Sequence, residues 1–350
     1  MVSAKLVVIY LERPTWPAAT CPKQSGSCSR RTRRTSTLIP SGVGNEGTSM
    51  HSDIGQFAVL RELRPTIEEN LARHRVESVQ WVPADFVRAE MYWGSRPSPL
   101  TETAKAALVT NLLVEQNIPL YRRDAGATEI GAWPSWLTDW SSERRRHSVA
   151  LTDYLVATRS VDPVALGRAR AQCMTVGFDA PMNGAHLLRS LVQVVLDESV
   201  STISHRNTAD QCHDPVADRL LGRIVADQEL HVRFFANLVS AALTVAPGLT
   251  VTAITEVVMN FQLPGTNLPG FARSAMLIAR DGIYDLARHL DEVLRPMLAQ
   301  WRIFERTDLG AGARSRDQLA DYLDHLDAQA ATIERSSVRT REYANALRAS

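Results

Sequence analysis

The stretch SSERRRHSVA, residues 141–150, places three consecutive arginines directly before His147. The preceding residues 133–140, WPSWLTDW, are aromatic and polar, so the whole segment predicts a helix that is half buried. A buried cation is costly unless an anion pairs with it. The stretch therefore directs attention to whatever faces Arg144 and His147 from neighbouring helices.

Two carboxylates in apolar surroundings are the candidates for that opposing charge. Glu115 lies in TNLLVEQNIPLY (110–121), and Glu198 lies in LVQVVLDESVSTIS (191–204). A lone carboxylate on such a helix is disfavoured unless it is paired or bound to a metal. His147 follows Glu115 by 32 residues, and His231 follows Glu198 by 33. Two matching halves, each with one Glu and one His, predict a four-helix bundle of the dimetal carboxylate type.

Apolar residues recur at helical spacing from about residue 54 onward, and turn motifs such as SRPSP, RSVDP, HDP and QLPGTNLPG separate the periodic segments. No alternating strand pattern of useful length is present in the sequence. The expected fold is all-α, a helical bundle with additional helices. The expected helices are 57–74, 102–121, 135–158, 185–207, 215–245, 249–260, 269–279, 284–303 and 314–346.

Composition is that of an ordinary globular protein, with 45% hydrophobic residues, 22% charged residues and a net charge of +1 over 350 residues. This balance gives no general preference for nucleic acid. No apolar run approaches the roughly 18 residues of a membrane span, so a cytoplasmic location is expected. The four cysteines have no C-x-x-C spacing, which favours reduced thiols over a disulfide framework or a zinc site.

Residues 1–49 differ from the rest, with seven Lys or Arg against two Glu and the motif RRTRR at 30–34. A segment rich in Pro, Ser, Gly and Thr cannot bury enough apolar surface to order itself, so disorder is expected. It is either a basic targeting or nucleic-acid arm or a stretch upstream of a true start at Met50. The helical domain is expected to span 50–350.

From about residue 55 to the C-terminus the sequence resembles the soluble acyl-acyl-carrier-protein (acyl-ACP) desaturase family, in its actinobacterial branch. The segments that carry the resemblance are LVEQNIPLYRR (113–123), WLTDWSSERRRHSVALTDYLVATRSVDP (136–163), ISHRNTADQCHDPVADRL (203–220), IVADQELHVRFF (224–235) and HLDEVLRPMLAQWRIFER (289–306). The resemblance implies a ferritin-like bundle with two iron ions, which activate dioxygen with electrons from a ferredoxin-type donor. The implied reaction removes two hydrogens from an acyl chain on acyl carrier protein, and the family is commonly homodimeric.

The resemblance also implies site residues. Retained metal-ligand positions are Glu115, His147, Glu198 and His231, and hydrogen-bonding positions around them are Trp81 and Asp227. The two bridging carboxylates of the family are absent, because Arg144 and Gln228 occupy their positions.

Charge decides how this departure is interpreted. Glu115, Glu198 and Arg144 together carry a formal charge of −1, which two divalent ions would raise to +3 in a buried pocket. We expect the Arg144 guanidinium to contact the remaining carboxylates in place of the missing cations. Two alternatives remain: one divalent ion on the four retained positions, or a site completed by Glu143 and Asp227, each four residues before a histidine.

Three functions stay open at this point. The chain is an acyl-ACP desaturase, or a non-catalytic homologue that binds acyl-ACP or pairs with an active desaturase, or a repurposed enzyme with one metal or none. The first follows from the resemblance, and the other two follow from Arg144 and Gln228.

Overall fold

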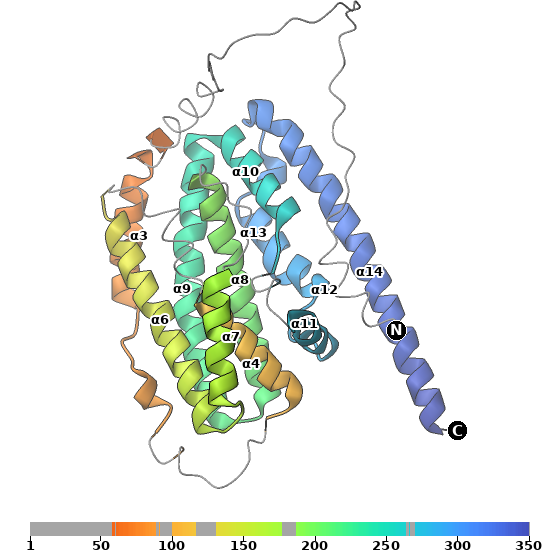
Figure 1. Cartoon of the computed structure of the whole chain (residues 1–350). Coiled ribbons are helices and arrows are strands. Elements are labelled where there is room, and N and C mark those ends of the chain that lie inside the picture. Colours follow the sequence, from red (N-terminus) through yellow and green to blue (C-terminus); the bar gives the residue numbers. More distant parts are fainter. Residues whose placement is uncertain are drawn as a thin grey trace, which may run out of the picture.

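The computed structural model describes residues 58–59, 61–88, 91, 100–116, 131–176, 187–263, 266 and 270–349. Within these ranges the chain forms helices and no strand, which confirms the all-α expectation. Long helices run side by side as a bundle, and shorter helices with the long C-terminal helix pack along one side of it (Figure 1). The expectations for residues 1–49 and 117–121 lie outside the described residues.

Five helices build the bundle: α3 (Arg64–Glu77), α4 (Glu102–Glu115), α6 (Trp133–Ala157), α8 (Leu187–Cys212) and α9 (Pro215–Val245). Local sequence signals set their starts. The Thr101 side chain accepts a hydrogen bond from the Ala104 amide at the start of α4. Asp214 caps α9, whose first residue is Pro215, a residue that suits this position because its missing N–H has no partner there anyway.

α8 and α9 form the most extensive contact of the bundle, joined by a tight turn in which His213 has a positive φ of 50°. Apolar residues of the bundle form two clusters. On α6 the first cluster holds Trp133–Trp140 and the second Ala150–Ala157. Along α9 the order is reversed: residues Ala217–Ile224 belong to the cluster that holds Ala150–Ala157, and residues from Phe234 onward belong to the cluster that holds Trp133–Trp140. A polar layer therefore separates two apolar cores at the same level of both helices.

The remaining elements flank the bundle. They are η1 (Pro83–Asp85), α7 (Pro163–Val176), α10 (Pro247–Asn260), α11 (Phe271–Arg280), α12 (Leu286–Arg288), the π-helix η3 (His289–Leu294), α13 (Arg295–Gln300), η4 (Ile303–Glu305), η5 (Gly310–Gly312) and α14 (Ala313–Ala349). Cys173 and Cys212 are buried free thiols, as the cysteine spacing predicted for the described part of the chain.

Three boundaries differ from the sequence-based expectations. Helix α7 was not expected at all. The helix expected over 284–303 is divided into α12, η3 and α13, and the division falls next to Pro296, which has no N–H to continue a helical ladder. The segment expected as one helix over 57–74 is helical at 58–59 and 61–62, and a turn at Leu63 precedes α3, which has Pro65 in its first turn.

None of the helices in the described ranges combines the length and the apolar character that crossing a membrane requires.

Candidate metal centre

The polar layer is built around two fully buried carboxylates with an arginine between them. Glu115 is the last residue of α4 and Glu198 lies in the middle of α8. Arg144 on α6 is itself only 1% exposed. Its Nη1 donates to Glu198 Oε1 at 2.5 Å, and its Nε lies 3.3 Å from Glu115 Oε2. Its Nη2 donates to the Val114 carbonyl at 2.8 Å.

Each carboxylate also accepts a hydrogen bond from a neutral side chain. Gln228 Nε2 donates to Glu115 Oε1 at 2.7 Å, and Trp140 Nε1 donates to Glu198 Oε1 at 3.0 Å. A buried carboxylate needs several such partners to offset its loss of hydration. Arg144, Gln228 and Trp140 provide these partners, each through a side-chain N–H group.

Each of the two histidines, on α6 and α9, contacts a carboxylate of the other helix. His147 on α6 faces Glu115 with Nδ1, at 3.5 Å, and Asp227 of α9 with Nε2, at 3.1 Å. His231 on α9 faces Glu198 with Nδ1, at 3.2 Å, and Glu143 of α6 with Nε2, at 2.7 Å. The two outer acids each precede a histidine by four residues, so each helix supplies the acid that fixes the ring of the other.

Asp227 has the larger set of outer partners. Trp81 Nε1 donates to its Oδ2 at 2.7 Å, and Arg146 Nη2 lies 3.4 Å from the same atom. Arg223 on the preceding turn of α9 contacts Oδ1. The Arg146 guanidinium also lies over the Trp81 ring, 4.9 Å from its centroid, a cation–π contact. Two arginines, Arg146 and Arg223, therefore contact the carboxylate that holds His147.

Opposite charges outweigh burial in setting the pKa values of the acids. Burial raises the pKa of Glu198, but Arg144 and His231 hold it at about 2. Burial likewise raises the pKa of Glu115, and Arg144 and His147 bring it below its ordinary value. The pKa of Asp227 lies below its ordinary value because His147, Trp81 and Arg223 outweigh burial. These three acids are therefore carboxylates at neutral pH.

The histidine pKa values shift in the opposite direction. Burial lowers the pKa of His231, but Glu198 and Glu143 raise it to about 10. The pKa of His147 is also raised, because Asp227 and Glu115 outweigh burial. The metal-free layer is thus a network of paired charges.

The structure brings all nine sequence-predicted residues into this one layer. They are Glu115, Glu198, His147, His231, Arg144, Gln228, Trp81, Asp227 and Glu143. The predicted contact of the Arg144 guanidinium with both remaining carboxylates is present.

Three contributors were missed. Trp140 on α6 donates a hydrogen bond from Nε1 to Glu198. His205 Nε2 on α8 lies 4.0 Å from Glu115 Oε1, while its Nδ1 contacts the Ser201 carbonyl at 2.8 Å. His74 on α3 contacts Glu143 at 3.1 Å. Helical periodicity could have predicted that His74 is buried, because it lies three residues after Leu71 and on the same face of α3 as Ile67 and Leu71.

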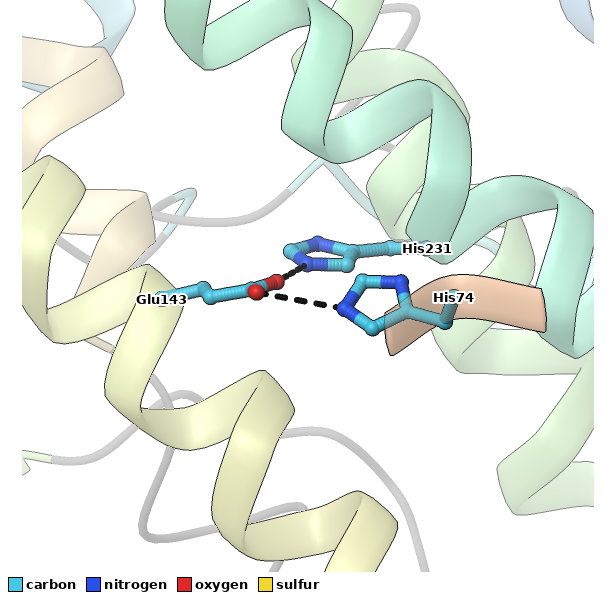
Figure 2. Close-up of side chains that lie close together, drawn as sticks. All are labelled: His74, Glu143 and His231. Carbon is cyan, nitrogen blue, oxygen red and sulfur yellow. Dashed lines mark hydrogen bonds and ion pairs between the residues drawn. The ribbon is translucent and has the colours of Figure 1, made fainter. Parts of the chain in front are cut away.

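His74, Glu143 and His231 form a buried group whose nitrogen and oxygen atoms lie within 4.8 Å of one another. Figure 2 shows the Glu143 carboxylate facing the edges of both rings, with one oxygen directed to each. Among the described residues this is the one set of three or more His, Cys, Asp or Glu with such a spacing.

A mostly apolar pocket that is open on one side adjoins the layer. Its walls come from α4 (Thr110, Val114), α8 (Val200, Ser204) and α11 (Ala275, Ile278). Val114 precedes Glu115 and also bonds Arg144 through its carbonyl. The apolar cavity and the charged layer therefore share one wall.

Comparisons with known proteins agree with this architecture. The chain matches the family described as fatty acid desaturase over residues 55–348. It is 38% identical over 309 residues to DesA1 of Mycobacterium tuberculosis, named as an acyl-[acyl-carrier-protein] desaturase, covering 83% of this chain and 91% of DesA1. A chloroplastic stearoyl-[acyl-carrier-protein] 9-desaturase 6 of Arabidopsis thaliana is 26% identical over 271 residues, covering 71% and 68%.

The fold has a solved counterpart in the X-ray structure of the acyl-ACP desaturase homologue DesA2 from M. tuberculosis H37Rv. The superposition has a TM-score of 0.59 and 25% sequence identity, and it covers 73% of this chain and 99% of DesA2. The family match covers most of the chain, and the alignment with DesA1 covers more than two thirds of it at 38% identity. The chain is therefore a member of the fatty acid desaturase family, related to the acyl-ACP desaturases.

Proposed function

We propose that this chain binds acyl chains carried by acyl carrier protein, and that it does not assemble a dinuclear iron centre or catalyse O2-dependent desaturation. One observation carries the second half of the proposal: the Arg144 guanidinium bridges Glu115 and Glu198 across the buried layer. In the related desaturases those carboxylates are ligand positions, and here a cation of the protein itself neutralises them.

The donor set does not fit two ferrous ions. Gln228 and Arg144 stand where the family has bridging carboxylates. A guanidinium offers no lone pair to a metal, and the Gln228 amide oxygen brings no negative charge to offset the two ions. The two carboxylates and Arg144 carry a formal charge of −1, and two divalent ions would raise it to +3. An excess of that size in a fully buried layer is prohibitive without further anions. Glu143 and Asp227 do not supply them between Glu115 and Glu198, because they contact the Nε2 atoms of His231 and His147, whereas Glu198 and Glu115 contact the Nδ1 atoms.

The adjoining cavity supports the first half of the proposal. Its lining is mostly apolar, with a few hydroxyl and amide groups such as Thr110, Ser201 and Asn111. Pockets of this kind bind apolar ligands by burying them and use the sparse polar groups for orientation. An acyl chain is the ligand of this chemical class that the family relationship suggests, and its carrier protein is the proposed partner.

Desaturation remains the second candidate, because the family match covers residues 55–348 and both histidines of the layer are present. This alternative needs iron to displace Arg144 from between the carboxylates. It also needs a ferredoxin-type donor, whereas the first candidate needs none. A homodimer, or a heterodimer with an active desaturase, is compatible with either function.

Iron analysis separates the two candidates. The chain is reconstituted anaerobically with Fe²⁺, desalted and analysed for bound iron, and acyl-ACP binding is measured on the same preparation. We expect acyl-ACP binding without a pair of irons and without product. Two irons per chain, with a double bond formed in the acyl chain under O2 and reductant, would refute the proposal.

A gain-of-function variant tests the same point from the other side. Arg144→Glu combined with Gln228→Glu restores both carboxylates, and we expect this variant to bind two irons per chain. Arg145→Glu with Gln228→Glu is the matched control, because the exposed Arg145 neighbours Arg144 but lies outside the layer. Iron binding by both double variants would show that position 144 does not decide the metal content.

A further inference from the structure

We propose that His74, Glu143 and His231 bind a single divalent transition-metal ion of the zinc type, beside the layer that Arg144 fills. The three residues come from three helices, α3, α6 and α9, which meet at this point of the bundle (Figure 2). All three are buried. The site differs from the family ligand positions, since it uses His74 and Glu143 and involves neither Glu115 nor His147.

The donors suit the ion. Two imidazole nitrogens and one carboxylate form a common three-ligand set for zinc, with a further position left to water. Ligands around a tetrahedral zinc lie about 3.3 Å apart, given bonds of about 2.0 Å. Glu143 Oε1 lies 3.1 Å from His74 Nε2, and Oε2 lies 2.7 Å from His231 Nε2. The carboxylate is thus already at ligand spacing from both rings, within about half an ångström.

The ring of His231 is oriented for this purpose by the Arg144 arrangement, so the inference rests on the proposed function. Arg144 and Trp140 hold Glu198, and Glu198 in turn contacts His231 Nδ1 at 3.2 Å. That leaves Nε2 directed at Glu143 and His74. A metal on Nε2 with a carboxylate on Nδ1 is the carboxylate–histidine–metal arrangement that fixes the tautomer and raises the basicity of the ligand.

His74 points to the same centre. Its Nδ1 is buried and has no hydrogen-bond partner among the described residues, so the polar contact of the ring lies on the Nε2 side, at Glu143. The Trp136 ring stands edge-on to both histidines, at centroid distances of 5.0 Å to His74 and 6.0 Å to His231. Trp136 therefore packs against both rings and restricts how far each can rotate away from Glu143.

Charge favours one ion here over two ions in the layer. The ion binds the neutral imidazole, so it takes the place of the proton that Glu198 and Glu143 otherwise hold on His231. A divalent ion with Glu143 then leaves a local formal charge of +1, against +3 for two ions with Glu115, Glu198 and Arg144. Arg146 Nη2 lies 4.0 Å from Glu143 Oε1 and opposes the ion. It also contacts Asp227 at 3.4 Å, so part of its charge is already neutralised.

Metal titration of the full chain tests the proposal. The protein is stripped with EDTA, and Zn²⁺ is titrated by calorimetry, with Co²⁺ as an optical probe of coordination. We expect one equivalent of either ion and a visible Co²⁺ spectrum typical of four-coordinate geometry. His74→Gln and, separately, Glu143→Gln should each weaken binding at least a hundredfold, with folding verified by circular dichroism. Using two variants on different helices guards against one of them failing to fold.

Two control variants test whether the ion binds at the His74–Glu143–His231 cluster rather than in the layer or at a surface histidine. Glu115→Gln alters the layer without touching the cluster, and His325→Gln removes an exposed histidine of α14. Both should retain one equivalent. Loss of binding in Glu115→Gln, or binding insensitive to His74 and Glu143, overturns the inference. Absence of binding at millimolar metal overturns it as well, but leaves the proposed function standing. Two equivalents lost in Glu115→Gln would refute both.

Discussion

Arg144 Nη1 lies 2.5 Å from Glu198 Oε1 in the fully buried centre of the bundle, and this ion pair joins α6 to α8 together with the hydrogen bond from Trp140 to Glu198. The same guanidinium reaches Glu115 and the Val114 carbonyl on α4. A single side chain therefore connects three helices at the level of the polar layer. The pair is a structural cross-link as well as the reason why metal is not expected there.

Removal of the Arg144 cation is expected to be strongly destabilising. Arg144→Met leaves two buried carboxylates without their counter-charge, which costs about 3–5 kcal/mol of unfolding free energy. The triple variant Arg144→Met, Glu115→Gln, Glu198→Gln should recover most of this loss, because neutral groups replace the whole charged set. Urea unfolding measures both. Arg145→Met, on the exposed neighbour, should change stability by no more than about 0.5 kcal/mol.

A carboxylate at position 228 is expected to destabilise the metal-free protein. Gln228 Nε2 donates to Glu115 Oε1 at 2.7 Å, so Gln228→Glu places two acids in contact. We expect a loss of about 3 kcal/mol at pH 7, which shrinks towards pH 5 as the two acids share a proton. Thermal unfolding at both pH values tests this. A variant that unfolds at the wild-type temperature at pH 7 would mean that Glu115 is not committed to Gln228.

Helix α7 is the long helix that the sequence-based expectations missed. α7 buries Leu166 and Cys173, but Val164 is exposed and Gly167 lies in its interior, so its periodic signal is weak. The division of the segment 284–303 was also missed. A π-helical turn leaves the hydrophobic spacing nearly unchanged, and only Pro296 marked the place.

The candidate site was largely predictable because its residues depart from the apolar helices that carry them. Glu115, Glu198 and Arg144 each stand out as charge on a buried face. His74 did not, because its helix has acids and arginines on its outer face, where Glu68 and Glu69 pair with arginines four residues away. The pairing of each histidine with the acid of the other helix depends on how α6 and α9 face each other, which no local sequence pattern encodes.

Close backbone contact requires Gly312. A Cβ at Gly312 would lie 2.6 Å from the Cα and the carbonyl oxygen of Gly248, where η5 crosses the start of α10. Because a backbone cannot move aside as a flexible side chain can, Gly312→Ala should cost about 1–3 kcal/mol. Gly222→Ala is the matched control on α9, with no atom within 4 Å of the added Cβ. It should stabilise the helix by about 0.5–1 kcal/mol, so chemical denaturation should separate the two variants by sign.

Acidification is expected to destabilise the protein through His289. Burial lowers the pKa of His289 to about 4, while Phe261 stacks on the ring at 5.0 Å and Tyr284 Oη lies 2.8 Å from Nδ1. The folded state thus favours the neutral ring, whereas the unfolded chain protonates near pH 6.5. The contribution of His289 is complete above pH 6.5 and is lost as the pH falls to about 4, by about 3 kcal/mol in total. His289→Gln should flatten this part of the stability profile, and His325→Gln should not.

Filling the cavity should abolish acyl binding without disturbing the charged layer. Ala275 on α11 lines the cavity, and Ala272 on the same helix is exposed, so Ala275→Phe and Ala272→Phe add the same ring in two places. A phenyl ring at 275 excludes about three methylenes of an acyl chain, and each buried methylene contributes about 0.8 kcal/mol. Acyl-ACP affinity should therefore fall about fifty-fold in Ala275→Phe and stay unchanged in Ala272→Phe.

The readout is the dissociation constant of an acyl-ACP, compared with that of the carrier protein without its acyl chain. If both variants bind acyl-ACP as the wild type does, the acyl chain lies elsewhere. If Ala275→Phe also weakens the bare carrier protein, the effect arises from the docking surface. Selective loss of the acyl-dependent part assigns the cavity, since only a chain inside it meets the side chain at 275.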